Sequence, residues 1–262
     1  MKSTSLVPLM VLATSVASAE TRMVIGDGRI DGTRIKPYEL EWFQCALQDD
    51  AWVDGGTLVE KLVVIGDHVL LVRQTVRQPG GMVRRSATYF DRKSFAPLRM
   101  EMEAMKDGSQ AAYVERELGP DGYTSIAVRG GEQSALQGAA SSNMLHGGAM
   151  GLPLAAMSFQ DEPVRFLASM IAFDATYDII AEWVGEDIIE FDGQEIVTWI
   201  IDVEWRHREI GDVYPPGPDA SGGRYWVAPH PPAGFPYVPR YKTDTYAVEF
   251  VRQTCPGTRN ER

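Results

Sequence analysis

Histidine and cysteine are scarce in this chain, which has four histidines and two cysteines among 262 residues. No two histidines have the spacing of the His-Glu-x-x-His zinc motif, and the cysteines lie too far apart for a Cys-x-x-Cys redox pair. A Gly-x-Ser-x-Gly hydrolase turn is missing as well. The nearest approach to a nucleotide-binding glycine loop, residues 26–32, misses the dinucleotide fingerprint by one residue. We therefore predict no catalytic residue, no metal site and no cofactor, and expect the protein not to be an enzyme.

Basic residues are fewer than acidic residues. The chain has 25 lysines and arginines and 36 aspartates and glutamates, which gives a net charge of −11. Nucleic acids bind to basic surfaces, and anionic lipid headgroups attract clusters of lysine and arginine. We therefore expect no nucleic-acid partner and no general attraction to anionic membranes. The excess of acid favours solubility.

A single long apolar stretch lies at the start of the chain, over residues 6–13. Lys2 precedes it, and Ala17-Ser18-Ala19 follows it. A basic start, a short apolar core and a small-residue end are typical of a secretory signal peptide, so we predict that residues 1–19 are removed by cleavage between Ala19 and Glu20. The stretch is too short to cross a bilayer. We expect a periplasmic or secreted bacterial protein without a transmembrane segment in its mature chain.

The two cysteines, Cys45 and Cys255, lie near opposite ends of the mature chain. In an oxidising compartment two cysteines often pair, and closing so long a loop is worth roughly 4–5 kcal/mol in the loop-entropy model. We predict a disulfide, with two buried free thiols as the alternative. Neither cysteine lies at the cleavage site, which excludes a lipid-modified N-terminal cysteine.

Residues 20–262 are predicted to form a single β-rich domain. The segment 98–104 alternates apolar and charged residues, the period of a half-buried strand. Short turns such as Asp192-Gly193 separate such runs, which is typical of an antiparallel meander. Further strands are expected at residues 58–65, 69–76, 82–90, 111–118, 123–128, 177–189, 195–205, 224–228 and 243–252.

Two segments interrupt this pattern. Ser141-Ser142-Asn143 predicts the start of a helix through residue 157, but the glycines and the proline within that segment predict a short or broken helix packed on the sheet. A loop over about residues 212–240 is rich in proline, glycine and aromatic residues. Loops of this length are either functional or variable surface decoration.

Carboxylates are concentrated around the turn at Asp192-Gly193. They allow two interpretations: a calcium site or a solvated hairpin face. Their spacing fits no calcium-loop pattern, which favours the solvated face. The residues are Glu182, Glu186, Asp187, Glu190, Asp192 and Glu195.

Apolar and aromatic residues are the remaining candidates for a functional site, and they include eleven methionines and six tryptophans. Several of them lie in the alternating strands and in the helical segment, where the simplest interpretation is a filled core. The alternative is the lining of an open apolar cavity between sheet and helix, because methionine suits irregular apolar surfaces. The candidate ligand-binding residues are Met100, Met102, Leu152, Leu154, Met157, Trp199 and Trp205.

Short, loosely spaced motifs over roughly residues 57–250, together with the order of the predicted strands and helix, resemble a known family. The motifs are Tyr89-Phe90-Asp91, Phe95-Ala96-Pro97-Leu98, Gly151-Leu152-Pro153-Leu154, Val184-Gly185-Glu186-Asp187, Asp192-Gly193, Trp199 and Tyr225-Trp226-Val227. On these residues the chain resembles exported bacterial proteins of unknown function that are similar to the periplasmic lipoprotein-localisation carriers. The resemblance implies an unclosed antiparallel half-barrel whose helices cover a cavity for acyl chains. The arginine that couples lid opening in those carriers matches no position here, and the missing anchor cysteine fits a soluble carrier better than a tethered receptor.

We therefore expect a curved antiparallel sheet or unclosed half-barrel that binds or carries a lipid, an acyl chain or another apolar ligand in the periplasm. A second hypothesis is a cell-envelope interaction or scaffolding protein with an envelope protein partner, which would make contact through Phe235, Tyr237 and Tyr241. A third is an enzyme acting on envelope polymers, for which His230 beside Tyr225 and Trp226 is the candidate.

Overall fold

The computed structural model describes residues 22–76, 83–138, 140–159, 162–170, 175–208, 220–244, 246–250 and 255. The predicted signal peptide and its cleavage site lie outside these residues, as does part of the predicted loop at 212–240. Within the described residues, no helix has the length and apolar character needed to cross a membrane.

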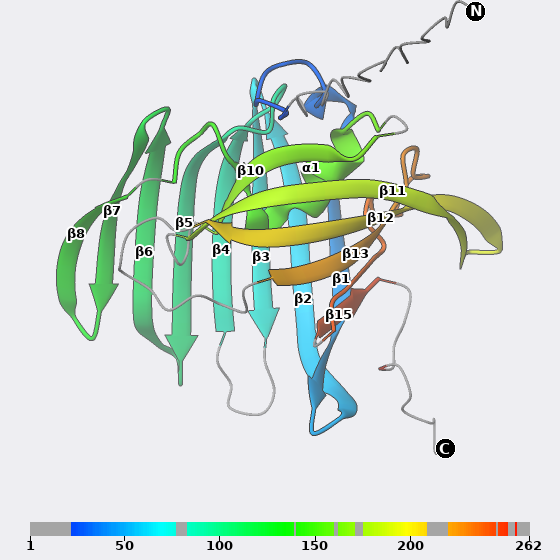
Figure 1. The fold of residues 1–262 in the computed structure, drawn as a ribbon. Helices are drawn as coiled ribbons and strands as arrows, with labels where there is room; N and C mark the ends of the chain where they lie inside the picture. The colour runs from blue at the N-terminus through cyan, green and yellow to red at the C-terminus, as the bar shows by residue number, and fades with distance from the viewer. Residues whose placement is uncertain are drawn as a thin grey trace, which may run out of the picture.

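A single sheet of fifteen strands forms the fold, with the order β8-β7-β6-β5-β4-β3-β2-β1-β15-β14-β13-β12-β11-β10-β9. The strands β10–β13 cross in front of β1–β5, so the sheet curves back over itself (Figure 1). Its edges, β8 and β9, are not paired with each other, and every pairing but β9–β10 is antiparallel. The predicted mainly β fold with an unclosed, curved antiparallel sheet is confirmed.

Most strands overlap the predicted runs, but the strands at residues 38–48, 132–138, 145–146, 164–170 and 240–242 were not predicted. In chain order the strands are β1 (Tyr38–Gln48), β2 (Ala51–Ile65), β3 (His68–Val76), β4 (Val83–Asp91), β5 (Pro97–Lys106), β6 (Ser109–Gly119), β7 (Gly122–Arg129), β8 (Glu132–Gly138), β9 (Leu145–His146), β10 (Val164–Met170), β11 (Ala175–Phe191), β12 (Gln194–Arg208), β13 (Ala220–Val227), β14 (Arg240–Lys242) and β15 (Tyr246–Glu249). A 3₁₀ turn, η1 (Gly32–Arg34), precedes β1.

The predicted broken helix is present as two short pieces, η2 (Gly147–Ala149) and α1 (Gly151–Ala156). We call residues 147–156 the insert. Gly147 shows why the helix is interrupted: a Cβ there would lie 2.7 Å from Met170 Sδ and 2.9 Å from a ring carbon of Trp205. The close approach of the insert to the sheet therefore requires glycine, at the cost of a longer helix.

The main core lies between the insert and the two halves of the sheet. It combines Leu62 and Phe90 from the first half with Ile179 and Ile201 from the second, and Leu154 from α1 fills the space between them. Because these residues come from strands far apart in the sequence, the core holds the curvature of the sheet in place.

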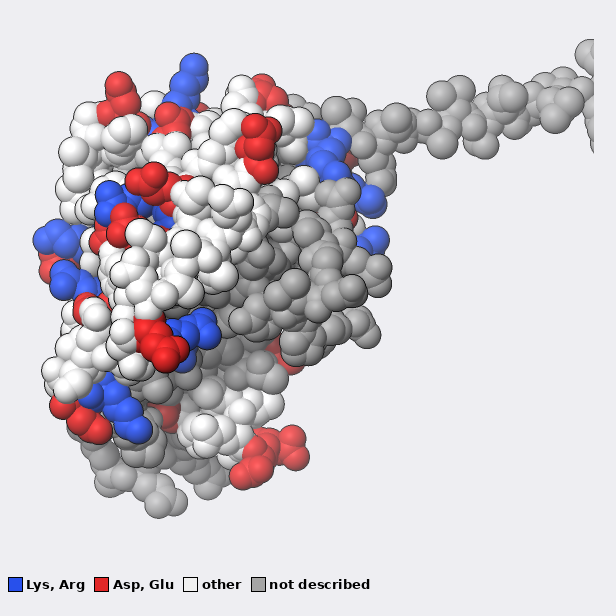
Figure 2. Space-filling model, turned by 90° about the vertical axis from the view of Figure 1, so that its left-hand side faces the viewer, with Lys and Arg blue, Asp and Glu red and all other residues white. Residues whose placement is uncertain are grey.

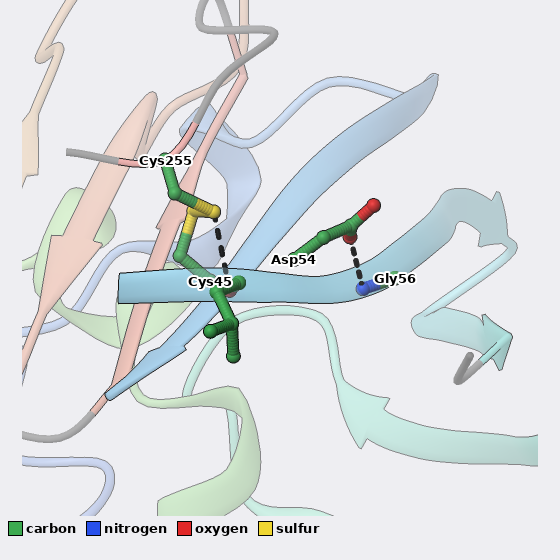
Figure 3. Close-up of a disulfide and its surroundings, with 5 residues drawn as sticks. Cys45, Asp54, Gly56 and Cys255 are labelled. Carbon is green, nitrogen blue, oxygen red and sulfur yellow. Dashed lines mark hydrogen bonds between the residues drawn. A yellow bond between two sulfur atoms is a disulfide. The ribbon is translucent and has the colours of Figure 1, made fainter. Parts of the chain in front are cut away.

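A disulfide joins Cys45 of β1 to Cys255, as predicted (Figure 3). The Cα atoms are 5.6 Å apart and 210 positions apart in the sequence. Beside the bond, the register of β1 and β2 shifts between Gln44 and Cys45. The Gly56 N–H donates to Asp54 Oδ1 over 2.7 Å at this bulge. The disulfide therefore fastens the C-terminal segment at an irregular point of the β1–β2 ladder.

Candidate functional site

A cavity of about 480 Å³ lies between the two halves of the sheet and the insert. Its volume falls within the range of small-molecule sites. Residues from β1–β3 form one wall, residues from β10–β15 form the opposite wall, and the insert contributes the rest. The lining residues are Tyr38, Trp42, Gln44, Leu58, Glu60, Arg73, Thr75, Gly147, Gly148, Met150, Gly151, Leu152, Met170, Tyr177, Trp205, Gly222, Tyr225, Val238, Tyr241, Thr243, Tyr246 and Val248.

Aromatic rings build the wall that β11–β15 provide. Tyr177 and Trp205 meet edge to face with ring centroids 5.5 Å apart, and Tyr225 and Tyr241 lie 4.3 Å apart. The second pair requires glycine at position 223, because a Cβ there would lie 2.7 Å from Tyr241 Cε2 and clash with the ring. The packed rings form a rigid apolar surface with hydroxyl groups at its margins.

A buried ion pair forms the polar part of the cavity. Arg73 Nε donates to Glu60 Oε2 over 2.5 Å, and the Tyr38 hydroxyl donates to Glu60 Oε1 over 2.6 Å. The Glu60 side chain is only 5% exposed. Burial raises the pKa of the Tyr38 hydroxyl well above its ordinary value, and the Glu60 carboxylate raises it further. Burial lowers the pKa of Arg73, but Glu60 and Tyr38 outweigh that effect and the net direction is upward, so the guanidinium stays charged.

Arg73 also connects the sheet to the insert, because its Nη1 donates to the Gly148 carbonyl. Reasoning from the sequence alone placed no arginine between the sheet and the helical segment. The structure places Arg73 in that position, with one side of its guanidinium on Glu60 and the other on the insert. A single side chain thus ties β2, β3 and the insert together at the cavity.

Beside this cluster, two buried side-chain nitrogens, Trp42 Nε1 and His146 Nδ1, have no hydrogen-bond partner among the described residues. Trp42 lines the cavity. His146 lies just before the insert. Burial, with a further contribution from the Arg73 charge, lowers the pKa of His146 to about 4. The imidazole is therefore neutral at pH 7.

The seven predicted ligand-binding residues are divided between the cavity and other parts of the fold. Leu152 and Trp205 line the cavity. Leu154 and Met157 are completely buried in the main core. Met100 packs in a separate cluster with Leu118, Tyr123 and Ala140, and Met102 is half-buried on the same strand, β5. Trp199 is half-buried and packs against the main core, with its ring 6.5 Å from that of Phe159.

The residues of the other two hypotheses do not gather into an exposed site. Phe235 and Tyr237 are buried, so the expectation of an exposed aromatic contact surface there is wrong. Tyr237 is held by its hydroxyl, which donates to the Arg34 carbonyl and accepts from the Lys36 N–H. Tyr241 lines the cavity, and His230 is exposed whereas Tyr225 is buried. The described residues include no group of three or more histidine, cysteine, aspartate or glutamate side chains placed to hold a metal ion.

Comparison with known proteins adds no relative. No family model, no curated protein and no solved structure matches this chain.

Proposed function

We propose that the protein is an exported binding or carrier protein for a lipid, an acyl chain or another apolar ligand, and that the ligand occupies the cavity between the sheet and the insert. The observation that carries this proposal is the cavity itself, about 480 Å³ in volume and walled largely by aromatic and aliphatic side chains. A filled sheet interior would leave no such space, because protein cores pack as densely as organic crystals.

The polarity of the cavity supports an uncharged ligand portion inside it. Glu60 and Arg73 neutralise each other, so a second charge would enter without a partner and would be costly to desolvate. An alkyl chain suits the aromatic wall, since burying about 200 Å² of apolar surface is worth about 5 kcal/mol.

The test fills the cavity without disturbing the core. Thr75 is half-buried and lines the cavity, so Thr75→Trp puts an indole into the space that the ligand needs. Thr124→Trp adds the same side chain at an exposed position of β7 and serves as the matched control. The measurements are native mass spectrometry of the periplasmic protein, solvent extraction of bound molecules, and titration with a dansyl-labelled fatty acid.

We expect the native protein and Thr124→Trp to carry lipid or bind the labelled fatty acid, and Thr75→Trp to lose most of that binding while remaining folded. Equal binding by the two tryptophan variants would place the ligand elsewhere on the protein. The proposal would be refuted if the native protein carried no bound lipid and did not bind the labelled fatty acid.

A further inference from the structure

The outer part of the β11–β12 hairpin, residues 182–198, projects beyond the neighbouring strands at the right of Figure 1. We call it the distal hairpin. Four large apolar side chains on it are exposed: Trp183 by 42%, Val184 by 46%, Ile188 by 57% and Val197 by 49%. Isolated exposed apolar residues are ordinary, but these four share one hairpin, and a cluster of this kind marks a contact surface.

One face of the distal hairpin is fixed to the rest of the protein. Ile189 is buried against Ala228 and Phe235. Asp187 accepts a hydrogen bond from Trp226 Nε1 over 2.9 Å and lies 3.5 Å from Arg240 Nη1. The hairpin is thus held by packing and by polar contacts on this side, and its opposite face is presented in a fixed orientation.

The opposite face has an ordered pattern. Ile188 and Val197 lie directly opposite each other in the β11–β12 ladder, so their side chains share that face. Two positions away on each side the same face carries carboxylates: Glu186 on one side, and the opposed pair Glu190 and Glu195 on the other. Like charges directly opposite each other in a ladder are destabilising, and no lysine or arginine occurs between residues 175 and 205 to relieve them.

This arrangement of charge differs from the other side of the protein. On the side of β8, basic and acidic residues lie interspersed (Figure 2). The distal hairpin combines one sign of charge with exposed apolar side chains, which favours a cationic and apolar partner. A second copy of the hairpin would add like charge, and an anionic membrane would repel it.

Over the same residues, no described strand pairs with the outer edge of β11. In the described part of the chain, β10 pairs with β11 only as far as Ala181, and β13 pairs with β12 only from Trp199. In the described residues, no strand pairs with the outer edge of residues 182–191, and the Ile188 N–H donates to Asp187 Oδ1 over 2.8 Å. Such an edge accepts an extended peptide as an additional strand.

We propose that the distal hairpin docks an extended segment of a partner protein along β11, and that the segment has the pattern cation-x-apolar-x-cation. In an added strand, alternate side chains fall on one face. A lysine or arginine then lies beside Glu186, an apolar residue beside Ile188, and a second cation beside Glu190. The backbone provides the hydrogen bonds, and these three side chains provide the selection.

The probe is a fluorescein-labelled peptide, Thr-Lys-Thr-Val-Thr-Lys-Thr, compared by fluorescence anisotropy with Thr-Thr-Lys-Lys-Val-Thr-Thr, which has the same composition in another order. The informative variant is Val197→Asp, because it removes apolar surface and adds negative charge. Simple attraction between charges predicts tighter binding to this variant, whereas docking on the apolar pair predicts binding weaker by about tenfold. Ile65→Asp makes the same kind of change at a position of β2 that is also 50% exposed, and is the matched control.

We expect the ordered peptide to bind more tightly than the permuted one, Val197→Asp to lose binding, and Ile65→Asp to keep it. Equal binding of the two peptides, tighter binding by Val197→Asp, or no binding by the native protein would each overturn the proposal. Circular dichroism of the variants checks that they are folded. Thr75→Trp should bind the peptide like the native protein, so failure of the lipid proposal and failure of this one are observed separately.

Discussion

Removing the positive member of the buried Glu60–Arg73 pair should destabilise the protein strongly. Glu60 lies opposite Arg73 in the β2–β3 ladder, and its carboxylate is almost completely inaccessible to solvent. In the Arg73→Met variant the apolar stem of the side chain is roughly preserved. Among the described residues, the Glu60 carboxylate then keeps only the Tyr38 hydroxyl as a hydrogen-bond partner while it stays buried, and the Gly148 carbonyl loses the Arg73 donor.

The size of the effect follows from these two losses. Stranding one member of a buried ion pair costs about 3–5 kcal/mol, and losing a hydrogen bond to a backbone carbonyl costs about 1 kcal/mol. We therefore expect Arg73→Met to lower the free energy of unfolding by about 4–6 kcal/mol. Adding Glu60→Gln removes the stranded charge and leaves an oxygen to accept the Tyr38 hydroxyl, so the double variant should recover about 3 kcal/mol.

Urea unfolding at pH 7, followed by circular dichroism, measures both variants against the native protein. Glu60→Gln alone completes the double-mutant cycle, and its coupling with Arg73→Met reports the pair itself. A loss below about 1 kcal/mol for Arg73→Met would refute the reasoning, since surface ion pairs have that magnitude. A double variant less stable than Arg73→Met would refute it as well.

Two further predictions concern stability. His146 is buried and its pKa is lowered to about 4, whereas the unfolded chain should titrate near 6.5. As the pH falls, His146 therefore takes up a proton in the unfolded state before it does so in the folded state. The free energy of unfolding is unaffected by this titration above about pH 6.5, and it decreases by about 3 kcal/mol in total as the pH falls toward 4. His146→Phe should flatten the pH dependence of urea unfolding over this window, and an unchanged slope would contradict the assignment. Replacing both Cys45 and Cys255 with serine removes a cross-link across 210 positions and should cost about 5 kcal/mol in the loop-entropy model. Thermal and urea unfolding with and without reductant measure this cost, and a change below about 1 kcal/mol would show that the loop-entropy model fails here.

Sequence alternation predicted many of the strands that have one buried face, but it missed β1 and β10. Residues 98–104 lie within β5, and the turn predicted at Asp192-Gly193 joins β11 to β12 with positive φ at both residues. Alternation failed for β8, whose residues are exposed along nearly all of the strand. Because neither face of β8 enters a core, its sequence has no apolar period to detect.

The Glu60–Arg73 ion pair at the cavity could have been predicted from the sequence. Glu60 stands between Leu58 and Leu62 at inward positions of β2, and a two-residue turn joins this strand to β3. A tight turn fixes the register of a hairpin, which places Glu60 opposite Arg73. The contact of Arg73 with the insert was not predictable in this way, because 75 positions separate Arg73 from Gly148 and no local rule relates them.

The cavity depends on the pairing of β1 with β15, which we call the seam. Because these strands are far apart in the sequence, the seam could not be predicted from hairpin turns. The two halves of the sheet meet where β1 pairs with β15, over four residue pairs from Phe43 to Ala46 in the described part of the chain. Trp42 and Gln44 on one side of this seam, and Tyr246 and Val248 on the other, line the cavity. So short a ladder between segments about 200 positions apart gains little from its own hydrogen bonds, at about 1 kcal/mol each, against the entropy of closing the chain. Cys45 lies within this ladder, and its disulfide partner Cys255 comes six positions after the end of β15. The disulfide is therefore best understood as the fastening of the seam, which holds the first and last strands together as walls of one cavity.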